Sequence, residues 1–378
     1  MPLVSVIVPT HNRPQFLRDA LESVVQQKFS DFEVLVVDDG SQPPAQPIVE
    51  SLADPRLRYF YQDQRGRSHA RNLGLRHAEG EFIALLDDDD WFLEDKLALQ
   101  VDYLRANPSV ELVAGGVNNA DELGRLTELE KGWLRQPNLR LPEALYSLPL
   151  LPSAVLFRRR LLSALETWFD SRATPAEDTD FFLRALAAGC CFEWQPEIVA
   201  VRRLHPGNSQ QDRRAYAEAY GYVFEKFFAS ARLPPYLVGR RNEVLGHYAL
   251  ISAMEAYQAG YMQMGASELL RALELSDWRN KDGARLLARA IASYATTKVS
   301  DDGAAFVDRV FDNLPGADDK LVGGRRHAQS AIYMDKVMKA VAQGKQPALK
   351  DWLRAVWIDP TWLTEKFSWA ALLKAWGR

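Results

Sequence analysis

Apolar runs separated by helical stripes dominate the first 210 residues. Residues 4–8, 32–37 and 82–86 are largely apolar with little alternation, which is typical of strands buried on both faces of a sheet. Between the first two runs, apolar residues recur at helical spacing from Phe16 to Val25. Strands that alternate with helices indicate βαβ units and a parallel sheet. We therefore predict an α/β domain with a mostly parallel sheet flanked by helices.

Weaker patterns extend this alternation towards residue 210. The segment 118–151 has little periodicity, so we expect an insertion or a loop that crosses the cleft. The further elements expected, in chain order, are a strand over 57–61 near the sheet edge, a helix over 66–77, a helical stripe from Leu93 to Leu104, a strand over 110–117, a strand over 152–157 and a helix over 158–168.

Two of the buried strands stop in carboxylates. Asp38 and Asp39 follow the second run, and four aspartates, 87–90, follow the third. Ligands of open α/β sheets bind beyond the carboxyl ends of the strands, so Thr10, Asp39 and Asp87 are expected on one rim. If the chain stays extended, Asp87 and Asp89 point to one side and Asp88 points away.

The run of four aspartates has two interpretations. An acidic run is often a solvated loop, and aspartate is common where a strand gives way to a turn. Neighbouring carboxylates also repel one another, so a bound cation is a physical reason to keep them together. Oxygen ligands favour Mn²⁺ or Mg²⁺, which is held by one or two carboxylates with substrate phosphates completing the shell. The common rim of the strands favours this second interpretation.

Two later segments carry candidate chemistry. A helix is expected to begin near residues 176–180, where Asp178 or Thr179 is a candidate N-cap and the helix dipole would keep the pKa of Asp178 low. Desolvation in a closing cleft would raise it. His205 lies in a polar loop at 202–209 and is either an ordinary loop histidine or a residue that closes over a ligand.

Composition and charge narrow the class of protein. The formal net charge of −4 provides no basic footprint for nucleic acid. We expect no membrane span and no secretory signal at the start of the sequence. The only two cysteines, Cys190 and Cys191, are neighbours and build no disulfide framework. These features favour the cytoplasm, with contact at the inner membrane face as an alternative.

From about residue 213 the sequence becomes helical in character. We expect domains over 1–212 and 213–378, the second being all-α. Residues 269–275 and 352–360 have similar sequences. This similarity fits either a tetratricopeptide-like array or a plain helical bundle. This half is expected to hold an acceptor substrate, a partner protein or a second copy of the chain. Trp362, Trp369 and Trp376 near one face of a final helix would pack in that domain or lie at a membrane interface.

Six motifs together resemble those of the family 2 glycosyltransferases, which have the GT-A fold. Each motif alone is weakly specific, but all six occur in the family's order within the first 210 residues. The Gln-x-x-Arg-Trp motif of processive synthases is broken, because Ala215 stands where its tryptophan would be. The six matching stretches are residues 4–12, 36–41, 70–74, 82–90, 176–181 and 203–209.

This resemblance implies roles for individual residues. The first stretch and the residue that follows it imply that Pro9, Thr10, His11 and Arg13 take part in donor binding. By family analogy, Asp39 binds the nucleobase. Its carboxylate would accept a hydrogen bond from N3–H of uracil or thymine, or from N1–H of guanine. By the same analogy, the donor and metal residues are Arg71, Asp87, Asp88, Asp89, Asp90 and His205, with Asp89 as the direct metal ligand and Asp90 as a helper.

Arg71 and Asp178 have simpler alternatives. Arg71 would offer its guanidinium to a phosphate or the base, or it is a surface charge on its helix. The resemblance makes Asp178 the general base that inversion requires, with Asp180 as the second choice. The alternative is that Asp178 only caps the helix.

The sequence therefore predicts a metal-dependent, inverting, non-processive glycosyltransferase. Its expected donor is a nucleotide-diphosphate sugar of UDP, dTDP or GDP type, and its expected acceptor is a saccharide or a lipid-linked glycan in surface polysaccharide or glycolipid assembly. Contact with a membrane surface and formation of a homodimer are two further partnerships that the sequence leaves open. Two rival functions are a non-catalytic nucleotide-binding scaffold and a nucleotidyltransferase, although the latter usually has a glycine-rich phosphate loop after its first strand.

Overall fold

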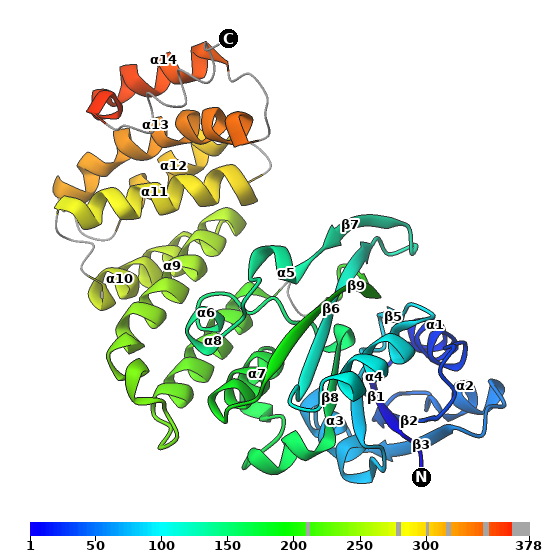
Figure 1. The fold of residues 1–378 in the computed structure, drawn as a ribbon. Helices are drawn as coiled ribbons and strands as arrows, with labels where there is room; N and C mark the ends of the chain where they lie inside the picture. The colour runs from blue at the N-terminus through cyan, green and yellow to red at the C-terminus, as the bar shows by residue number, and fades with distance from the viewer. Residues whose placement is uncertain (209–211, 277–280, 300–301, 315–318, 343–347, 365–378) are drawn as a thin grey trace. The chain divides into compact units, whose positions relative to one another are not determined.

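A computed structural model of the chain divides into two compact units, Met1–Gly239 and Arg240–Arg378. The residues that the structure describes are 1–208, 212–276, 281–299, 302–314, 319–342 and 348–364. The first unit holds the sheet and the second is helical (Figure 1), which confirms the predicted fold class.

One mixed sheet organises the first unit. Its strand order is β3-β2-β1-β4-β8-β6-β9-β5, and β7 pairs with β6. The predicted strand at the sheet edge is β3, and β1 pairs in parallel with both β2 and β4. The strands are β1 (Val4–Thr10), β2 (Phe32–Asp39), β3 (Leu57–Gln62), β4 (Phe82–Leu85), β5 (Trp91–Phe92), β6 (Leu112–Ala120), β7 (Leu126–Glu130), β8 (Val155–Arg158) and β9 (Phe192–Arg203).

Hydrophobic burial fixes this sheet. Every residue of β1, β2 and β4 is buried, as expected for central strands covered on both faces. In the β1–β2 pairing Thr10 lies opposite Asp38, so both strands end at the same rim. The helices of this unit are α1 (Pro14–Val25), α2 (Gln46–Ser51), α3 (Arg67–His77), α4 (Lys96–Ala106), α5 (Gly132–Arg135), α6 (Leu141–Ala144), α7 (Glu177–Ala187) and α8 (Arg213–Phe228).

Two local expectations differ from the structure. The expected helix over 158–168 is a short 3-10 helix, Arg159–Ala164, because the backbone becomes extended at Leu165, which ends the helix. The segment 118–151 is not a simple loop, since it contains β7, α5 and α6.

The contact boundary between the units lies after Gly239 rather than after Asp212. Helix α8 joins the first unit because its side chains pair with residues around α7. Tyr222 Oη and Lys226 Nζ each lie 2.9 Å from Asp170 Oδ2, and Lys226 Nζ lies 2.9 Å from Asp180 Oδ1. The helical composition that begins near residue 213 therefore does not coincide with the change of compact unit.

The second unit has its own apolar core. Gly260, in the left-handed conformation, ends α9, and Gly265 allows the next helix to approach the ring of Tyr257. Of the two similar sequence segments, 269–275 lies in α10 and 352–360 covers the end of α14 and the two residues after it. The tetratricopeptide interpretation stays a prediction. The helices are α9 (Arg241–Ala259), α10 (Met262–Leu275), α11 (Lys281–Lys298), α12 (Gly303–Asp312), α13 (Asp319–Ala342) and α14 (Leu349–Ile358), followed by a 3-10 helix, Pro360–Thr364.

Trp362 is the one described tryptophan of the expected final stripe. Its indole is buried, stacks on His327 at 5.3 Å between ring centroids, and donates to Ser330 Oγ at 3.0 Å. This tryptophan therefore packs within the helical unit. Trp369 and Trp376 lie outside the described residues. Of the helices that the structure describes, none is both long enough and apolar enough to cross a bilayer.

Gly74 shows how tightly α3 packs on the sheet. A Cβ at this position would lie 2.6 Å from Cγ2 of Ile7 in the fully buried β1 strand. We expect Gly74→Ala to lower stability by about 1–3 kcal/mol, despite the better helix propensity of alanine, because the β-branched Ile7 cannot move away. Urea unfolding measures the change.

Gly239→Ala is the matched control. An added Cβ there meets no atom within 4 Å, so its effect should stay within about 0.5 kcal/mol. If Gly74→Ala is as stable as the wild type, the close packing of α3 against β1 is not required.

Candidate active site

A cavity of about 320 Å³ lies at the rim where β1, β2 and β4 end. The predicted site residues line it, except His205 and the second-choice base Asp180, although they come from segments far apart in the sequence. Arg67, Glu177, Arg202 and Tyr216 also line it and were not predicted. The remaining lining residues are Leu151, Pro152, Leu204 and Asn208.

The four aspartates form a turn rather than an extended segment. Strand β4 ends at Leu85, and the N–H of Asp90 donates to the carbonyl of Asp87 at 3.0 Å. The alternation of sides therefore stops before Asp88, which lines the cavity instead of pointing away. We call residues 87–90 the acidic turn.

Asp88 and Asp89 share one basic partner. Arg13 Nη1 donates to Asp88 Oδ1 at 3.1 Å and to Asp89 Oδ2 at 2.7 Å, and Thr10 Oγ1 donates to Asp88 Oδ2 at 2.8 Å. Burial and the neighbouring Asp89 carboxylate raise the pKa of Asp88 to about 7. The acidic turn thus holds more buried carboxyl groups than Arg13 alone can neutralise.

Asp90 is anchored on the opposite side of the turn. Its carboxylate accepts from Ser153 Oγ at 2.6 Å and from the N–H of Arg203 at 3.2 Å. Burial, followed by repulsion from Asp89 and Asp87, raises the pKa of Asp90 well above its ordinary value. These contacts fix the turn against β9, and the metal-helper role of Asp90 stays a prediction.

Arg71 is a buried structural residue, so the surface-charge interpretation is wrong. Its side chain is 1% exposed, with Nη2 2.5 Å from Asp87 Oδ1 and Nη1 2.6 Å from Glu177 Oε1. Arg67 also pairs with Glu177, donating through Nη2 to Oε2 at 3.0 Å. This cluster connects α3, the acidic turn and α7, which fixes the position of neighbouring Asp178.

Glu177 and Arg67 were missed because their role needs a partner from a distant segment. Glu177 occupies the first acidic position of the Glu-Asp motif, and this was the only available signal. Its side chain is fully buried, which for a glutamate requires cationic partners. Local sequence does not reveal that α3 provides both of them.

Asp178 lies at the first turn of α7 and faces the cavity. The N-cap position belongs to Ala176, so the expected cap by Asp178 or Thr179 is wrong, although Asp178 Oδ1 does accept from the N–H of Thr179 at 2.7 Å. Burial and the adjacent Glu177 charge raise the pKa of Asp178 to about 6. Desolvation therefore outweighs the helix dipole that was expected to keep this pKa low.

Asp180 is committed to other partners. It is 2% exposed, its Oδ2 lies 2.5 Å from Arg184 Nη2, and its Oδ1 lies 2.9 Å from Lys226 Nζ. It is not among the residues that line the cavity. Asp178 is thus the better placed of the two candidate bases.

Asp39 organises the loop beside the end of β2. Its Oδ1 accepts from Gln62 Nε2 at 2.7 Å and from the N–H of Arg65 at 2.8 Å, while Oδ2 accepts from the N–H of Gly66 at 2.8 Å. Asp39 lines the cavity, and Oδ2 has two lone pairs, of which the bond from Gly66 uses one. A base contact by Asp39 is compatible with this arrangement and stays a prediction.

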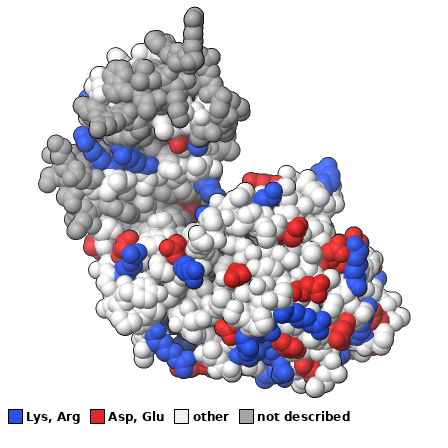
Figure 2. Space-filling model, viewed as in Figure 1, with Lys and Arg blue, Asp and Glu red and all other residues white. Residues whose placement is uncertain are grey.

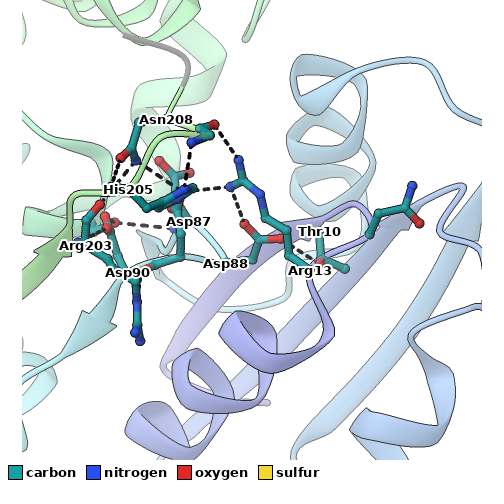
Figure 3. A network of polar contacts seen from close by, with 12 residues as sticks. Thr10, Arg13, Asp87, Asp88, Asp90, Arg203, His205 and Asn208 are labelled. Carbon is teal, nitrogen blue, oxygen red and sulfur yellow. Dashed lines mark hydrogen bonds and ion pairs between the residues drawn. The ribbon is translucent and has the colours of Figure 1, made fainter. Parts of the chain in front are cut away.

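His205 meets the acidic turn from the loop after β9. It is buried, with Nε2 3.0 Å from Asp89 Oδ2, and its Nδ1 accepts from the N–H of Gly207 at 3.1 Å. Figure 3 shows His205 and Asn208 on one side of Arg13 and Asp88. Because Nδ1 is the acceptor, Nε2 carries the proton in this state.

Asp89 Oδ2 and His205 Nε2 are spaced like two ligands of a divalent cation. Oxygen and nitrogen ligands about 2.1 Å from an octahedral ion lie roughly 3 Å apart, as these two atoms do. For Nε2 to bind the ion, the imidazole proton has to move to Nδ1, which ends the hydrogen bond from Gly207. Among the described residues no group of three or more His, Cys, Asp and Glu side chains forms a complete metal cage. Mg²⁺ and Mn²⁺ sites commonly take water and phosphate oxygens for the other positions.

Comparison with protein families confirms the predicted resemblance for part of the chain. Residues 5–164 match the model of "Glycosyl transferase family 2". The chain is also 41% identical over 102 residues to GalNAc(5)-diNAcBac-PP-undecaprenol beta-1,3-glucosyltransferase of Campylobacter jejuni, which is 26% of this chain and 33% of that protein. It spans only 15–35% of the length of three uncharacterised Rickettsia glycosyltransferases that it matches.

Solved structures share the fold at low sequence identity. Residues 1–349 of TarS from S. aureus, in complex with UDP-GlcNAc, superimpose with a TM-score of 0.58, 17% identity and coverage of 91% of this chain and 92% of that one. A Pyrobaculum calidifontis mannosyltransferase with GDP-Man and Mn²⁺ gives a TM-score of 0.54 at 22% identity, covering 89% and 88%. At these identities the likeness concerns the fold.

The buried pairing of Glu177 predicts a large loss of stability when its charge is removed. Glu177→Gln would leave Arg67 and Arg71 without their shared partner inside the protein. We expect a loss of roughly 3 kcal/mol in the free energy of unfolding, measured by chemical denaturation. Glu22→Gln, which breaks a solvent-exposed pair with Arg18, should change it by less than about 1 kcal/mol. Equal losses for the two variants would contradict the role given to Glu177.

Proposed function

We propose that this protein is a metal-dependent, inverting glycosyltransferase that moves one sugar from a nucleotide-diphosphate donor to an acceptor hydroxyl. The observation that carries the proposal is the meeting of the acidic turn and Asp178 in one cavity. A cation at the turn suits a diphosphate, and a carboxylate of raised pKa suits a proton acceptor. The acidic turn would form the donor side of a sugar-transfer site, and Asp178 would form its acceptor side.

The donor would lie across the rim of the sheet. Asp39 would accept a hydrogen bond from the nucleobase, and Pro9, Thr10 and His11 would line the nucleotide. The UDP-GlcNAc and GDP-Man named for the two similar structures support a nucleotide-diphosphate sugar as the substrate class. The base stays open among uracil, thymine and guanine.

Asp89 and His205 would hold the divalent cation, Mn²⁺ or Mg²⁺. When bound, such an ion acts as a Lewis acid that stabilises charge on a leaving diphosphate. The Mn²⁺ named for the Pyrobaculum structure supports this assignment. Asp87 would remain held by Arg71, so that the acidic turn keeps its shape while Asp89 binds the ion.

Asp178 would act on the acceptor side. In a single displacement with inversion, a base must take the proton of the attacking hydroxyl. A pKa of about 6 leaves Asp178 ionised at neutral pH yet more basic than an ordinary aspartate. The pairing of Glu177 with Arg67 and Arg71 would keep Asp178 directed into the cavity.

The acceptor is proposed to be a saccharide or lipid-linked glycan in surface polysaccharide or glycolipid assembly. The name of the Campylobacter relative, which contains a PP-undecaprenol-linked glycan, supports this class. Lys, Arg, Asp and Glu are intermixed over the described part of the face drawn in Figure 2. This mixture and the net charge of −4 give no support to nucleic acid as a partner.

The rival function is a scaffold that binds nucleotide without catalysis. Such a protein would not need a cavity-facing carboxylate of raised pKa opposite its acidic turn. Asp178→Asn distinguishes the two functions, because an enzyme should lose transfer by about 100-fold or more while nucleotide-diphosphate affinity stays within about threefold. Nucleoside diphosphate release and calorimetric titration measure the two quantities.

Asp102→Asn, a charge change on the exposed face of α4, is the matched control and should leave both quantities unchanged. Transfer that persists at near-normal rate in Asp178→Asn would exclude Asp178 as the base. A wild-type protein that binds the nucleotide but never transfers sugar, across a panel of donors and acceptors, would favour the scaffold.

The raised pKa of Asp178 also predicts the pH dependence of transfer. Below a pH of about 6 the carboxyl becomes protonated in the free enzyme, so kcat/KM should fall about tenfold for each further unit of acidity. Above this pH the base is ionised and kcat/KM should level off. A pH–rate profile with nucleotide binding measured in parallel tests this, and a flat profile down to about pH 5 would contradict the assignment.

A further inference from the structure

Arg13 occupies the position of a cation beside the acidic turn. Besides its contacts with Asp88 and Asp89, its Nη2 donates to the carbonyl of Gly207 at 3.1 Å. Figure 3 shows the guanidinium between Asp88 and the loop that carries His205. One side chain therefore ties together the end of β1, the acidic turn and the loop after β9.

The oxygen needed for a metal is already surrounded by donors. Asp89 Oδ2 lies 2.7 Å from Arg13 Nη1, 3.0 Å from His205 Nε2 and 3.5 Å from Asn208 Nδ2. Asp89 Oδ2 has two lone pairs, so this oxygen cannot keep all three partners and also coordinate a cation beside His205 Nε2. Some of the donors must withdraw when an ion binds.

Arg13 is the arginine best able to withdraw. Its side chain is 33% exposed, whereas the side chain of Arg71 is 1% exposed and is held between two carboxylates. A divalent ion on Asp89 would repel the guanidinium, and a diphosphate would offer oxygens that suit its planar fork. Displacement of Arg13 therefore costs less burial than displacement of Arg71 would, and it leads to new partners.

We propose that Arg13 is a displaceable counter-cation, which neutralises Asp88 and Asp89 without donor and leaves Asp89 when a divalent ion and a diphosphate bind together. This inference rests on the proposed function, since it assumes that Asp89 is the metal ligand. It makes Arg13 a positioning residue with two consequences. The ion alone binds weakly, and the ion and the nucleotide diphosphate strengthen each other's binding.

Calorimetric titration of the full chain with MnCl₂, in the absence of nucleotide, tests the first consequence. Arg13→Met should lower the Kd for Mn²⁺ by about tenfold or more, because a charge-assisted hydrogen bond no longer competes for Asp89. Arg13→Lys keeps the charge without the fork and should give a smaller gain. This second variant also tests the proposal if Arg13→Met fails to fold.

Two arginine variants separate displacement from a general change in charge. Arg202→Met removes a charge from the same cavity, but Arg202 pairs with Asn119 and Glu130 rather than the acidic turn. Arg18→Met removes one from the outer face of α1. Both should change the Kd for Mn²⁺ by less than about threefold. A gain in Arg202→Met equal to that in Arg13→Met would overturn the proposal.

Titrations repeated with UDP, dTDP and GDP test the second consequence. The diphosphate that binds should tighten Mn²⁺ binding in the wild type at least about fivefold more than in Arg13→Met. No tightening of Mn²⁺ binding in Arg13→Met without nucleotide would overturn the inference even if sugar transfer is observed. Conversely, tighter Mn²⁺ binding by Arg13→Met in a protein that transfers no sugar would support the counter-cation role while rejecting the proposed function.

Discussion

The buried contact of Arg71 with Asp87 and Glu177 is the constraint on which the site depends. It joins a helix, the acidic turn and the start of α7, which are separated by up to 106 residues along the chain. Removing such charges from water is costly, so the cluster is stable only when every partner is present. It thereby sets the distance between the acidic turn and Asp178.

The same cavity is lined by more acidic than basic side chains. Asp88, Asp89 and Asp90 lie within one turn, and the raised pKa values of Asp88 and Asp90 reflect the cost of burying their charges together. Arg13 balances part of that charge. A divalent ion would take over this balance at Asp89 and release Arg13 to pair with the diphosphate, which explains why metal and donor should bind together.

Sequence reasoning captured the features that depend on local pattern. The apolar runs located β1, β2 and β4, and the common rim of parallel strands correctly brought Thr10, Asp39 and Asp87 to one cavity. The motifs identified the family that residues 5–164 match. These predictions succeeded because strand burial and chain topology determine them.

Features that depend on contacts between distant segments could not be predicted from local sequence patterns. The burial of Arg71 depends on Glu177, and the inward position of Asp88 depends on a turn that begins sooner than the apolar run suggests. Helix α8 carries the composition of the second unit but packs with the first through Asp170 and Asp180. Each case needs knowledge of which segments meet in space.

We propose that Asp89 recruits a cation which holds the donor diphosphate. Calorimetric titration of UDP, dTDP and GDP into the wild type and Asp89→Ala, with and without Mn²⁺, tests it most directly. We expect one nucleotide diphosphate to bind the wild type at least about tenfold more tightly with Mn²⁺, and this gain to vanish in Asp89→Ala. The same metal-dependent gain in both proteins would contradict the claim.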